Sequence, residues 1–258
     1  MSTLKNPPII EAIVEIRWGK INKIANPANF EFTPDDTDFF LGSFRDIARK
    51  NGFENVEPLL PKGVPHFPHL PMYRFRQAPQ KWPCYQMGLG IFTINQVRHD
   101  YDWITFKKAI IKGLKMVDLA HPKKLAGLPA LGISLTYQDG FLLNGTHSTD
   151  FLQRNFDLGL HLPAELLNAK SIENPAFNLS ISSSLVCSKP GGILNISVQE
   201  ALINKEPGIV MNTSIISSDG NKPEFTVENL SKWLEDAHKT NLFAFKKILK
   251  TEYLETLK

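Results

Sequence analysis

The chain has 258 residues, of which 42% are hydrophobic and 21% charged, with a formal net charge of +3. This balance is typical of a globular protein and excludes a disordered chain. No apolar run is long enough for a transmembrane helix, and the first residues lack the apolar core of a secretory signal. Cys84 and Cys187 predict no disulfide framework. We therefore expect a cytoplasmic protein that makes no membrane contact.

The first half of the chain predicts a strand, a helix, two strands and a second helix. Apolar residues alternate from Ile9 to Trp18, as in a strand with one buried face. Residues 33–52 have helical spacing, with acidic residues at the start. After a proline-rich loop, 72–77 and 84–97 are expected to form a strand pair, and the apolar residues of 102–119 repeat at helical spacing.

The second half predicts a strand, two short helices, three strands and a final helix. The first strand is expected at 131–143 and the short helices at 148–156 and 163–169. Hairpin-type loops then join three strands, at 177–188, 192–203 and 208–218. Thr226 suits the N-cap of a helix that runs toward residue 249.

These elements predict an α+β fold with a largely antiparallel sheet and helices packed on one face. The two halves, 1–126 and 127–258, read as similar strand-helix-strand-strand-helix units, and we expect them to pack as one globular unit. Residues 1–129 hold 18 Lys and Arg against 12 Asp and Glu, whereas 130–258 hold 11 against 14. The first half is therefore mildly basic and the second mildly acidic, which permits a polyanionic partner for the first.

Glu11, Glu15 and Arg17 share one face of the first strand. Paired carboxylates can bind a divalent metal or act as acid and base, so one hypothesis is a metal-dependent phosphate-handling enzyme. The alternative is that Arg17 bridges both carboxylates, or pairs with residues of other strands, and fixes the register of the sheet. The later strands favour this alternative, because the polar side chains that they offer to such a site are neutral: Ser180, Ser182, Asn195, Ser197, Asn212 and Ser214.

A second hypothesis is nucleic-acid binding by the first half. Lys108, Lys112 and Lys115 recur at helical spacing and share one helix face, where they would contact phosphates. The alternative is that this face is the solvated side of an amphipathic helix. Other basic residues that would join such a surface are Arg74, Arg76, Arg98, Lys123 and Lys124.

The histidines and the known catalytic motifs give no active site. His66 and His69 form an H-x-x-H pair, but zinc needs four ligands and no other His or Cys lies close in sequence. The chain has no Walker A loop, nucleophile elbow, H-E-x-x-H or C-x-x-C motif. We expect no catalytic residue, metal or cofactor, and we favour a protein without enzymatic activity.

Two motifs resemble those of a sporadically distributed family of uncharacterised bacterial proteins of similar length. One is the strand motif P-x-x-E-A-x-x-E-I-R, which contains Glu11, Glu15 and Arg17, and the other is the helix motif W-L-x-x-A-H, which ends at His238. On a third strand the family tends to carry Arg and Asn, whereas this chain has Ser134, Thr136 and Tyr137. The resemblance marks the motif residues, His238 included, as candidate functional positions, although a lone histidine on a helix also suits packing.

The resemblance implies an accessory system, such as phage defence or a toxin–antitoxin pair, and no settled biochemical activity. Our leading expectation is a non-catalytic binding, adaptor or sensor subunit that acts with a protein partner from a neighbouring gene. A homo-oligomer is compatible with each of the three hypotheses.

Overall fold

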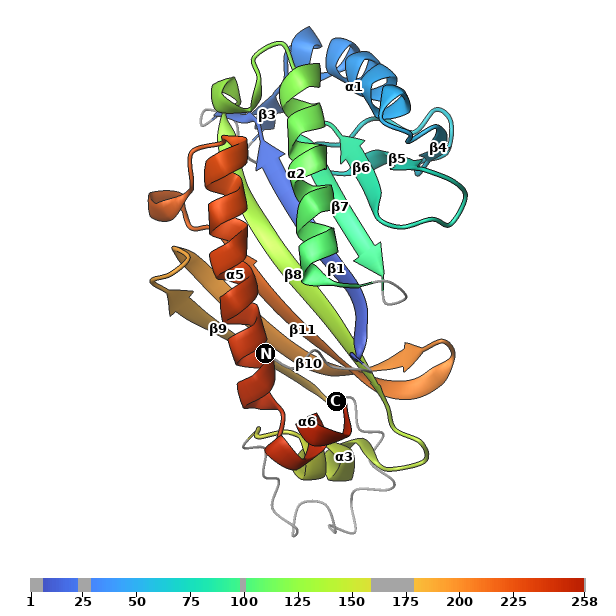
Figure 1. Cartoon of the computed structure of the whole chain (residues 1–258), viewed down its shortest axis with the longest axis vertical. Helices are drawn as coiled ribbons and strands as arrows, with labels where there is room; N and C mark the ends of the chain where they lie inside the picture. The colour runs from blue at the N-terminus through green and yellow to red at the C-terminus, as the bar shows by residue number, and fades with distance from the viewer. Residues whose placement is uncertain (1–6, 23–28, 98–100, 159–178, 258) are drawn as a thin grey trace.

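A single antiparallel sheet of nine strands runs through the protein (Figure 1). The structure is a computed structural model that describes residues 7–22, 29–97, 101–158 and 179–257. The strand order is β4-β5-β6-β7-β1-β8-β11-β10-β9, and every neighbouring pair is antiparallel. The strands are β1 (Ile9–Trp18), β4 (Asn55–Pro58), β5 (Pro71–Arg76), β6 (Cys84–Gly88), β7 (Ile91–Val97), β8 (Ala130–Leu142), β9 (Ser180–Cys187), β10 (Gly192–Ile203) and β11 (Glu206–Ile216). Two further strands, β2 (Lys20–Asn22) and β3 (Asn29–Glu31), form a separate hairpin.

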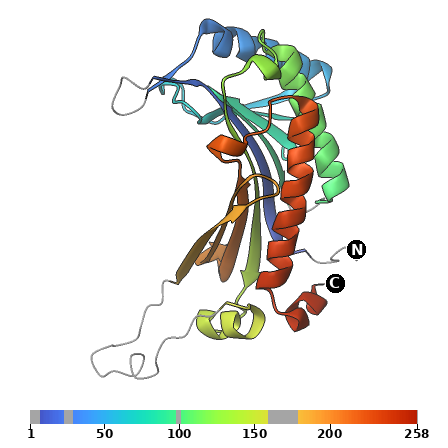
Figure 2. The ribbon, with the colours of Figure 1, turned by 90° about the vertical axis from the view of Figure 1, so that its left-hand side faces the viewer.

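Helices cover one face of the large sheet, as Figures 1 and 2 show. The covering helices are α1 (Asp38–Lys50), α2 (Trp103–Ala120) and α5 (Val227–Ile248). Two shorter helices, α3 (Ser148–Asn155) and α6 (Thr251–Thr256), lie together at one end. Short 3-10 turns occupy Pro34–Asp36, Leu125–Gly127 and Asp219–Asn221. The predicted α+β class, with an antiparallel sheet and helices on one face, is confirmed. Among the described residues, none of the helices combines the length and the apolar character that a membrane crossing requires.

The core lies between this sheet face and the helices. The alternation predicted for β1 is confirmed, because Ala12, Val14, Ile16 and Trp18 are all fully buried there. Helix α2 approaches the sheet closely at Gly113, where an added Cβ would lie 2.7 Å from Cε1 of Tyr85. Such a contact leaves no room for a side chain.

Local capping explains where two of the helices begin. The carboxylate of Asp102 accepts a hydrogen bond of 2.8 Å from the backbone N–H of Thr105 at the start of α2. The hydroxyl of Thr226 accepts one of 3.2 Å from the N–H of Asn229 at the start of α5. The N-cap predicted at Thr226 is therefore confirmed.

The two halves follow the same path through the sheet. In each half the first strand, β1 or β8, lies beside the last strand of an antiparallel meander, β7 or β11. The remaining strands of the meander then run outward in reverse order. Strands β1 and β8 pair at the centre, so one sheet crosses the predicted boundary between residues 126 and 127.

Some predicted elements differ from the structure. The predicted strand 84–97 is two strands, β6 and β7, because the chain turns at Gly90, whose φ is +69°. Strand β4 was not predicted because it follows helix α1 directly and ends in the proline-rich loop. The first half therefore contributes a meander of four strands, β4 to β7, instead of two. The predicted helix 163–169 lies outside the described residues.

The first edge of the sheet is short and well guarded. Strand β4 has four residues and ends at Pro58, which has no N–H to donate to another strand. The carboxylate of Glu57 lies 3.3 Å from Nε of Arg76 and 3.6 Å from an outer nitrogen of Arg74. A charge, a proline and a short length are the usual means of protecting an edge strand.

Candidate functional site

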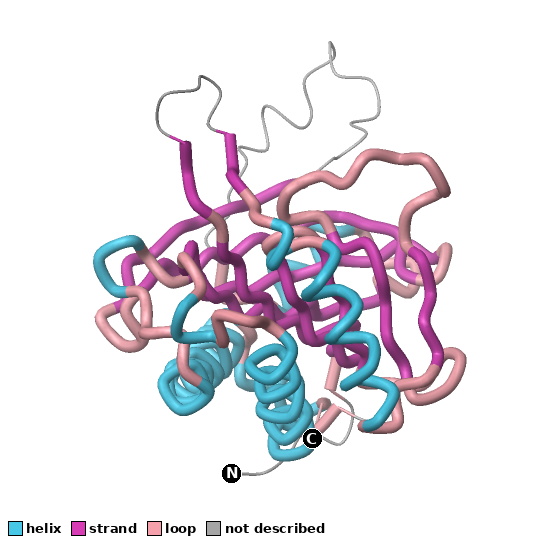
Figure 3. The backbone as a smooth tube through the Cα atoms, turned by 90° about the horizontal axis from the view of Figure 1, so that it is seen from above, coloured by secondary structure: helices cyan, strands magenta, loops and turns pink. Residues whose placement is uncertain are grey.

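The sheet face that no described helix covers is here called the open face (Figure 3). Directly paired residues on neighbouring strands point to the same face. Glu11 and Ile13 of β1 therefore share this face with their partners on three further strands, β8, β11 and β10. Those partners are Gln138, Asn212 and Ser197 in the row of Glu11, and Thr136, Ser214 and Asn195 in the row of Ile13.

Hydrogen bonds link the open-face side chains across strands. The Thr136 and Ser214 hydroxyls lie 2.7 Å apart, and the amide of Asn212 donates to the hydroxyl of Ser197 at 3.2 Å. The neutral residues that the sequence offered on its later strands thus lie on the same face as the motif carboxylates. The centre of the open face has many hydrogen-bonding groups and few charges.

The motif residues of β1 do not act as one charge cluster. Nε of Arg17 lies 2.6 Å from an oxygen of Glu15, whereas Glu11 accepts a hydrogen bond of 2.8 Å from the amide of Asn95. The prediction that Arg17 bridges both carboxylates is therefore wrong. Glu11 and Arg17 lie six positions apart on an extended strand, a span of roughly 20 Å that no arginine side chain covers.

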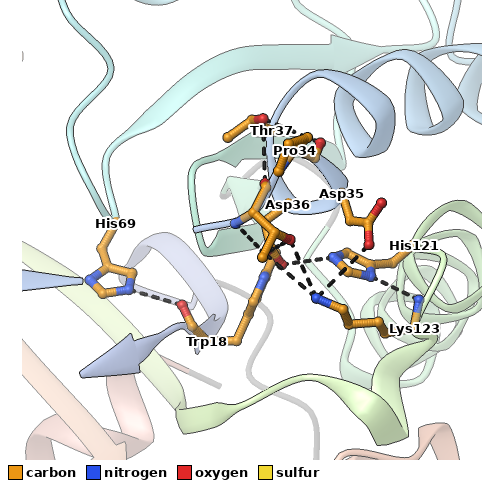
Figure 4. Close-up of polar contacts among 9 residues, drawn as sticks. Trp18, Pro34, Asp35, Asp36, Thr37, His69, His121 and Lys123 are labelled. Carbon is orange, nitrogen blue, oxygen red and sulfur yellow. Dashed lines mark hydrogen bonds and ion pairs between the residues drawn. The ribbon is translucent and has the colours of Figure 1, made fainter. Parts of the chain in front are cut away.

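Glu15 and Arg17 line a hollow of about 360 Å³ at one end of the open face. Phe30 of the β2–β3 hairpin and His69 lie on its wall, with ring centroids 4.5 Å apart. Nε2 of His69 is 3.1 Å from the carbonyl oxygen of Trp18 (Figure 4). Burial lowers the pKa of His69, so its neutral ring donates this hydrogen bond. The hollow combines one ion pair, aromatic walls and hydroxyl groups.

The chemistry of this hollow suits binding. The Arg17 guanidinium neutralises Glu15, so the carboxylate is already engaged. In the parts of the chain that the structure describes, no group of three or more His, Cys, Asp or Glu side chains could hold a metal ion. His69 has one ring nitrogen committed to the Trp18 carbonyl. Arginine, aromatic and apolar side chains that border an open hollow, as Arg17, Phe30 and Ile21 do here, are typical of the centre of a protein interface.

The predicted basic residues do not form one surface. Phe75 packs on Phe44 of α1, with ring centroids 5.1 Å apart, so Arg74 and Arg76, its neighbours on β5, point to the opposite side of the sheet. There both arginines lie near Glu57. The prediction that they join the lysines of α2 is wrong, because the two sets occupy opposite layers. Arg98 lies outside the described residues.

Lys108, Lys112 and Lys115 of α2 line a second hollow, of about 380 Å³, on the helical side of the molecule. Lys108 and Lys115 are exposed there. Lys112 donates a hydrogen bond of 2.9 Å to the carbonyl oxygen of Asn51 at the end of α1, and its Nζ lies 5.1 Å from the ring centre of Phe53. Lys112 therefore has a structural role in holding α1 against α2.

Lys123 lies beside a buried pair that the sequence did not reveal, Asp36 and His121 (Figure 4). Nε2 of His121 is 3.1 Å from Oδ1 of Asp36, and Nδ1 accepts a hydrogen bond of 3.2 Å from the N–H of Lys123. Burial lowers the pKa of His121. Burial alone would raise the pKa of Asp36, but hydrogen bonds from Thr33 and His121 bring it below its ordinary value. All of these groups have partners, so the pair clamps the end of α2 to the turn before α1. Lys124, one residue further along, is exposed and has a positive φ of 53°.

His238 belongs to a cluster that joins α2, β8 and α5. Its ring stacks on the indole of Trp103, with centroids 4.0 Å apart and planes 9° apart. Nδ1 lies 2.8 Å from the hydroxyl of Tyr137, which accepts a hydrogen bond of the same length from Tyr101. Burial lowers the pKa of His238 to about 4. The ring is therefore neutral near pH 7, and Tyr137 donates to Nδ1.

Asp139 lies near this cluster and is not among the candidate functional residues that the sequence predicts. A small hollow of about 100 Å³ is lined by Asp139 together with Tyr101, Tyr137 and His238. Asp139 is 5% exposed, and burial raises the pKa of its carboxyl to about 7. Asp139 shares the helix-facing side of β8 with Leu135 and Tyr137. An acidic residue among the apolar residues of a buried strand face is the sequence signal that marks it.

Comparison with known proteins does not assign the chain to a family. No family model matches it, and no curated protein does either.

Proposed function

We propose that the protein is a non-catalytic bacterial cytosolic binding subunit that holds a protein partner on its open face. It would act as an adaptor or sensor in an accessory system such as phage defence or a toxin–antitoxin pair, as the motif resemblance implies. The observation that carries the proposal is the open face itself, with the hollow at Glu15 and Arg17.

The border of the hollow has the composition of a protein-binding centre. Ile21 and Ile216 line the hollow and are 48% and 44% exposed. They line the same hollow as Arg17, whose side chain is 49% exposed. Arginine is enriched at the energetic centres of interfaces, and exposed apolar side chains beside it supply area that is favourable to bury. A partner that contacts this border would bury both.

The alternatives receive less support from the charges. A nucleic-acid surface would need a continuous positive field, but Arg74 and Arg76 lie on the layer opposite the α2 lysines. A phosphate-handling site would need free carboxylates for a metal, but Asn95 binds Glu11 and Arg17 binds Glu15. We therefore rank nucleic-acid binding and phosphate handling below protein binding.

The experiment is co-expression with the products of the neighbouring genes, followed by size-exclusion chromatography and calorimetry. We expect one of them to co-elute with the wild-type protein. Arg17→Glu should abolish the complex, because the new carboxylate repels Glu15 and reverses the charge of the hollow. Lys115→Glu, on the opposite layer, is the matched control and should leave binding unchanged. Failure of every neighbouring product to bind, or equal binding by both variants, would contradict the proposal.

A further inference from the structure

The second edge of the sheet, strand β9, is long and unguarded. Its inner side pairs with β10, and no strand of the described residues pairs with its outer side. The sequence of β9 is SISSSLVC, without a charged residue or a proline. Leu185 and Val186 are 51% and 91% exposed. Figure 2 shows the strands of this end lying away from α5.

An edge strand of this kind presents a row of unpaired backbone N–H and C=O groups and readily accepts another strand. Strand β4 carries Glu57 and ends in Pro58, whereas the described residues of β9 have neither a charge nor a proline to protect the edge. The pairing directions of β9 are also known. Ser182 and Ser184 pair with Ser197 and Asn195, so their side chains lie on the open face, and the odd-numbered side chains lie on the helical face.

We propose that β9 is the contact strand of a homodimer, in which a second copy of this chain adds its own β9 in antiparallel orientation about a twofold axis at Ser183. An axis perpendicular to the sheet keeps the open face of both copies on the same side. Ser183 then lies opposite its own copy, and Ser182 lies opposite Ser184 of the second copy. On the helical face, Ile181 lies opposite Leu185.

The side chains select this register over its neighbours. With the axis at Ser183, Ile181 meets Leu185 on the helical face and Ser182 meets Ser184 on the open face, while Val186 lies opposite Ser180. An axis moved to Ser182 would place Ser183 opposite Ile181, and an axis moved to Ser184 would place it opposite Leu185. Both shifts lose the apolar pair, and such cross-strand pairs are the main source of side-chain stabilisation in a sheet.

The occupant is a second copy because the edge is complementary to itself. Strand β9 has no charged residue, so two copies of it do not repel each other. For the same reason β9 does not attract a partner of opposite charge. A contact along one strand buries less than the roughly 1,200 Å² at the lower end of standard interfaces. The dimer should therefore form with modest affinity and depend on concentration.

The first experiment is sedimentation velocity of the wild-type protein from about 1 μM to about 200 μM, the range over which a micromolar dimer forms. We expect dimer at the upper end. Ser183→Lys should remain monomeric, because two like charges meet on the axis. Ser182→Lys with Ser184→Glu should keep the dimer, whereas Ser182→Lys with Ser184→Lys should lose it. All three residues are exposed, so circular dichroism and thermal unfolding should show an unchanged fold.

The second experiment tests the register by disulfide cross-linking. Ser183→Cys should give a covalent dimer under mild oxidation, because the axis brings the residue against its own copy. Cys187 is the internal control, since it lies on the same strand and face but opposite Leu179 of the second copy. A monomer at every concentration, a dimer that survives Ser183→Lys, or cross-linking of the wild-type protein through Cys187 would overturn the proposal. None of these results depends on the partner proposed for the hollow at Arg17.

Discussion

The hydroxyl of Tyr137 and Nδ1 of His238 lie 2.8 Å apart and join the central strand β8 to the last long helix, α5. Tyr101 adds its own hydrogen bond to the same hydroxyl, and Trp103 of α2 stacks on the imidazole. The cluster therefore ties both halves of the chain together. Its residues come from three segments, and the histidine is one that the motif resemblance had marked.

We predict that Tyr137→Phe is more destabilising than Tyr101→Phe. The first change removes a hydroxyl that takes part in two partly buried hydrogen bonds, and the second removes a hydroxyl that donates one. The expected losses in the free energy of unfolding are about 2 to 3 kcal/mol and about 1 kcal/mol. Urea unfolding at pH 7 measures both. Equal losses would show that the bond to His238 contributes nothing to stability.

The buried carboxyl of Asp139 predicts a dependence of stability on pH. Burial raises its pKa to about 7 in the folded protein, against about 3.9 in an unfolded chain. Between these values the folded state binds a proton that the unfolded state does not. The free energy of unfolding contributed by this group is therefore lost as pH rises through about 7.

Asp139→Asn should remove that loss, because an amide does not ionise. We expect the variant to be more stable than the wild-type protein at pH 8 by on the order of a few kcal/mol, and this advantage should shrink as pH falls through about 7 and disappear only below about pH 4. His238 acts in the opposite direction at lower pH, since burial lowers its pKa to about 4, but its contribution cancels when variant and wild type are compared. Thermal unfolding across the pH range is the measurement, and a constant difference would refute the prediction.

Gly113 of α2 and Gly42 of α1 form a matched pair of helical glycines. An added Cβ at position 113 would lie 2.7 Å from Tyr85 and 3.2 Å from Phe92, whereas none of the described atoms lies within 4 Å of one at position 42. Gly42→Ala should stabilise the protein by about 0.5 to 1 kcal/mol, through helix propensity. Gly113→Ala should destabilise it by about 1 to 3 kcal/mol, because overpacking outweighs the same gain. Denaturant unfolding of both variants would decide, and stabilisation by both would show that α2 can move away from the sheet.

The lysines Lys108, Lys112 and Lys115 of α2 should differ in their contributions to stability. Lys112→Ala should cost about 1 kcal/mol of stability, because it removes the hydrogen bond to Asn51 and the contact with Phe53. Lys108→Ala and Lys115→Ala should each cost less than about 0.5 kcal/mol, as expected for exposed positions. Unfolding curves test this ranking. A nucleic-acid role would show instead as salt-sensitive retardation that Lys108→Glu and Lys115→Glu abolish.

Periodicity was sufficient to predict most of the fold. Strand β1 and helices α2 and α5 each have one apolar face, and the structure buries that face. The turn at Gly90 was missed because Gly88 and Gly90 stand within a continuous apolar pattern, in which a glycine also suits a bulge. Strand β4 was missed because a proline ends it and its neighbours resemble a loop.

The candidate site was predictable only where one strand determines it. The side on which Glu11, Glu15 and Arg17 lie follows from alternation along β1. The neutral serines and asparagines of β10 and β11 join that side through pairing registers that no single segment reveals. Asp36 and His121 are 85 positions apart in the sequence. The sheet face on which Arg74 lies depends on which face helix α1 covers. These relationships are properties of the assembled fold.

The difference between the two edges of the sheet limits how many copies of the protein can assemble. If both edges could pair with further copies, the protein would polymerise without end, as amyloid-forming edge strands do. In the proposed dimer, β9 pairs with β9 of the second copy. Glu57 and Pro58 of β4 protect the opposite edge of each copy from further pairing. Assembly through this sheet would stop at two chains, so the protein can keep one reactive edge without forming fibrils.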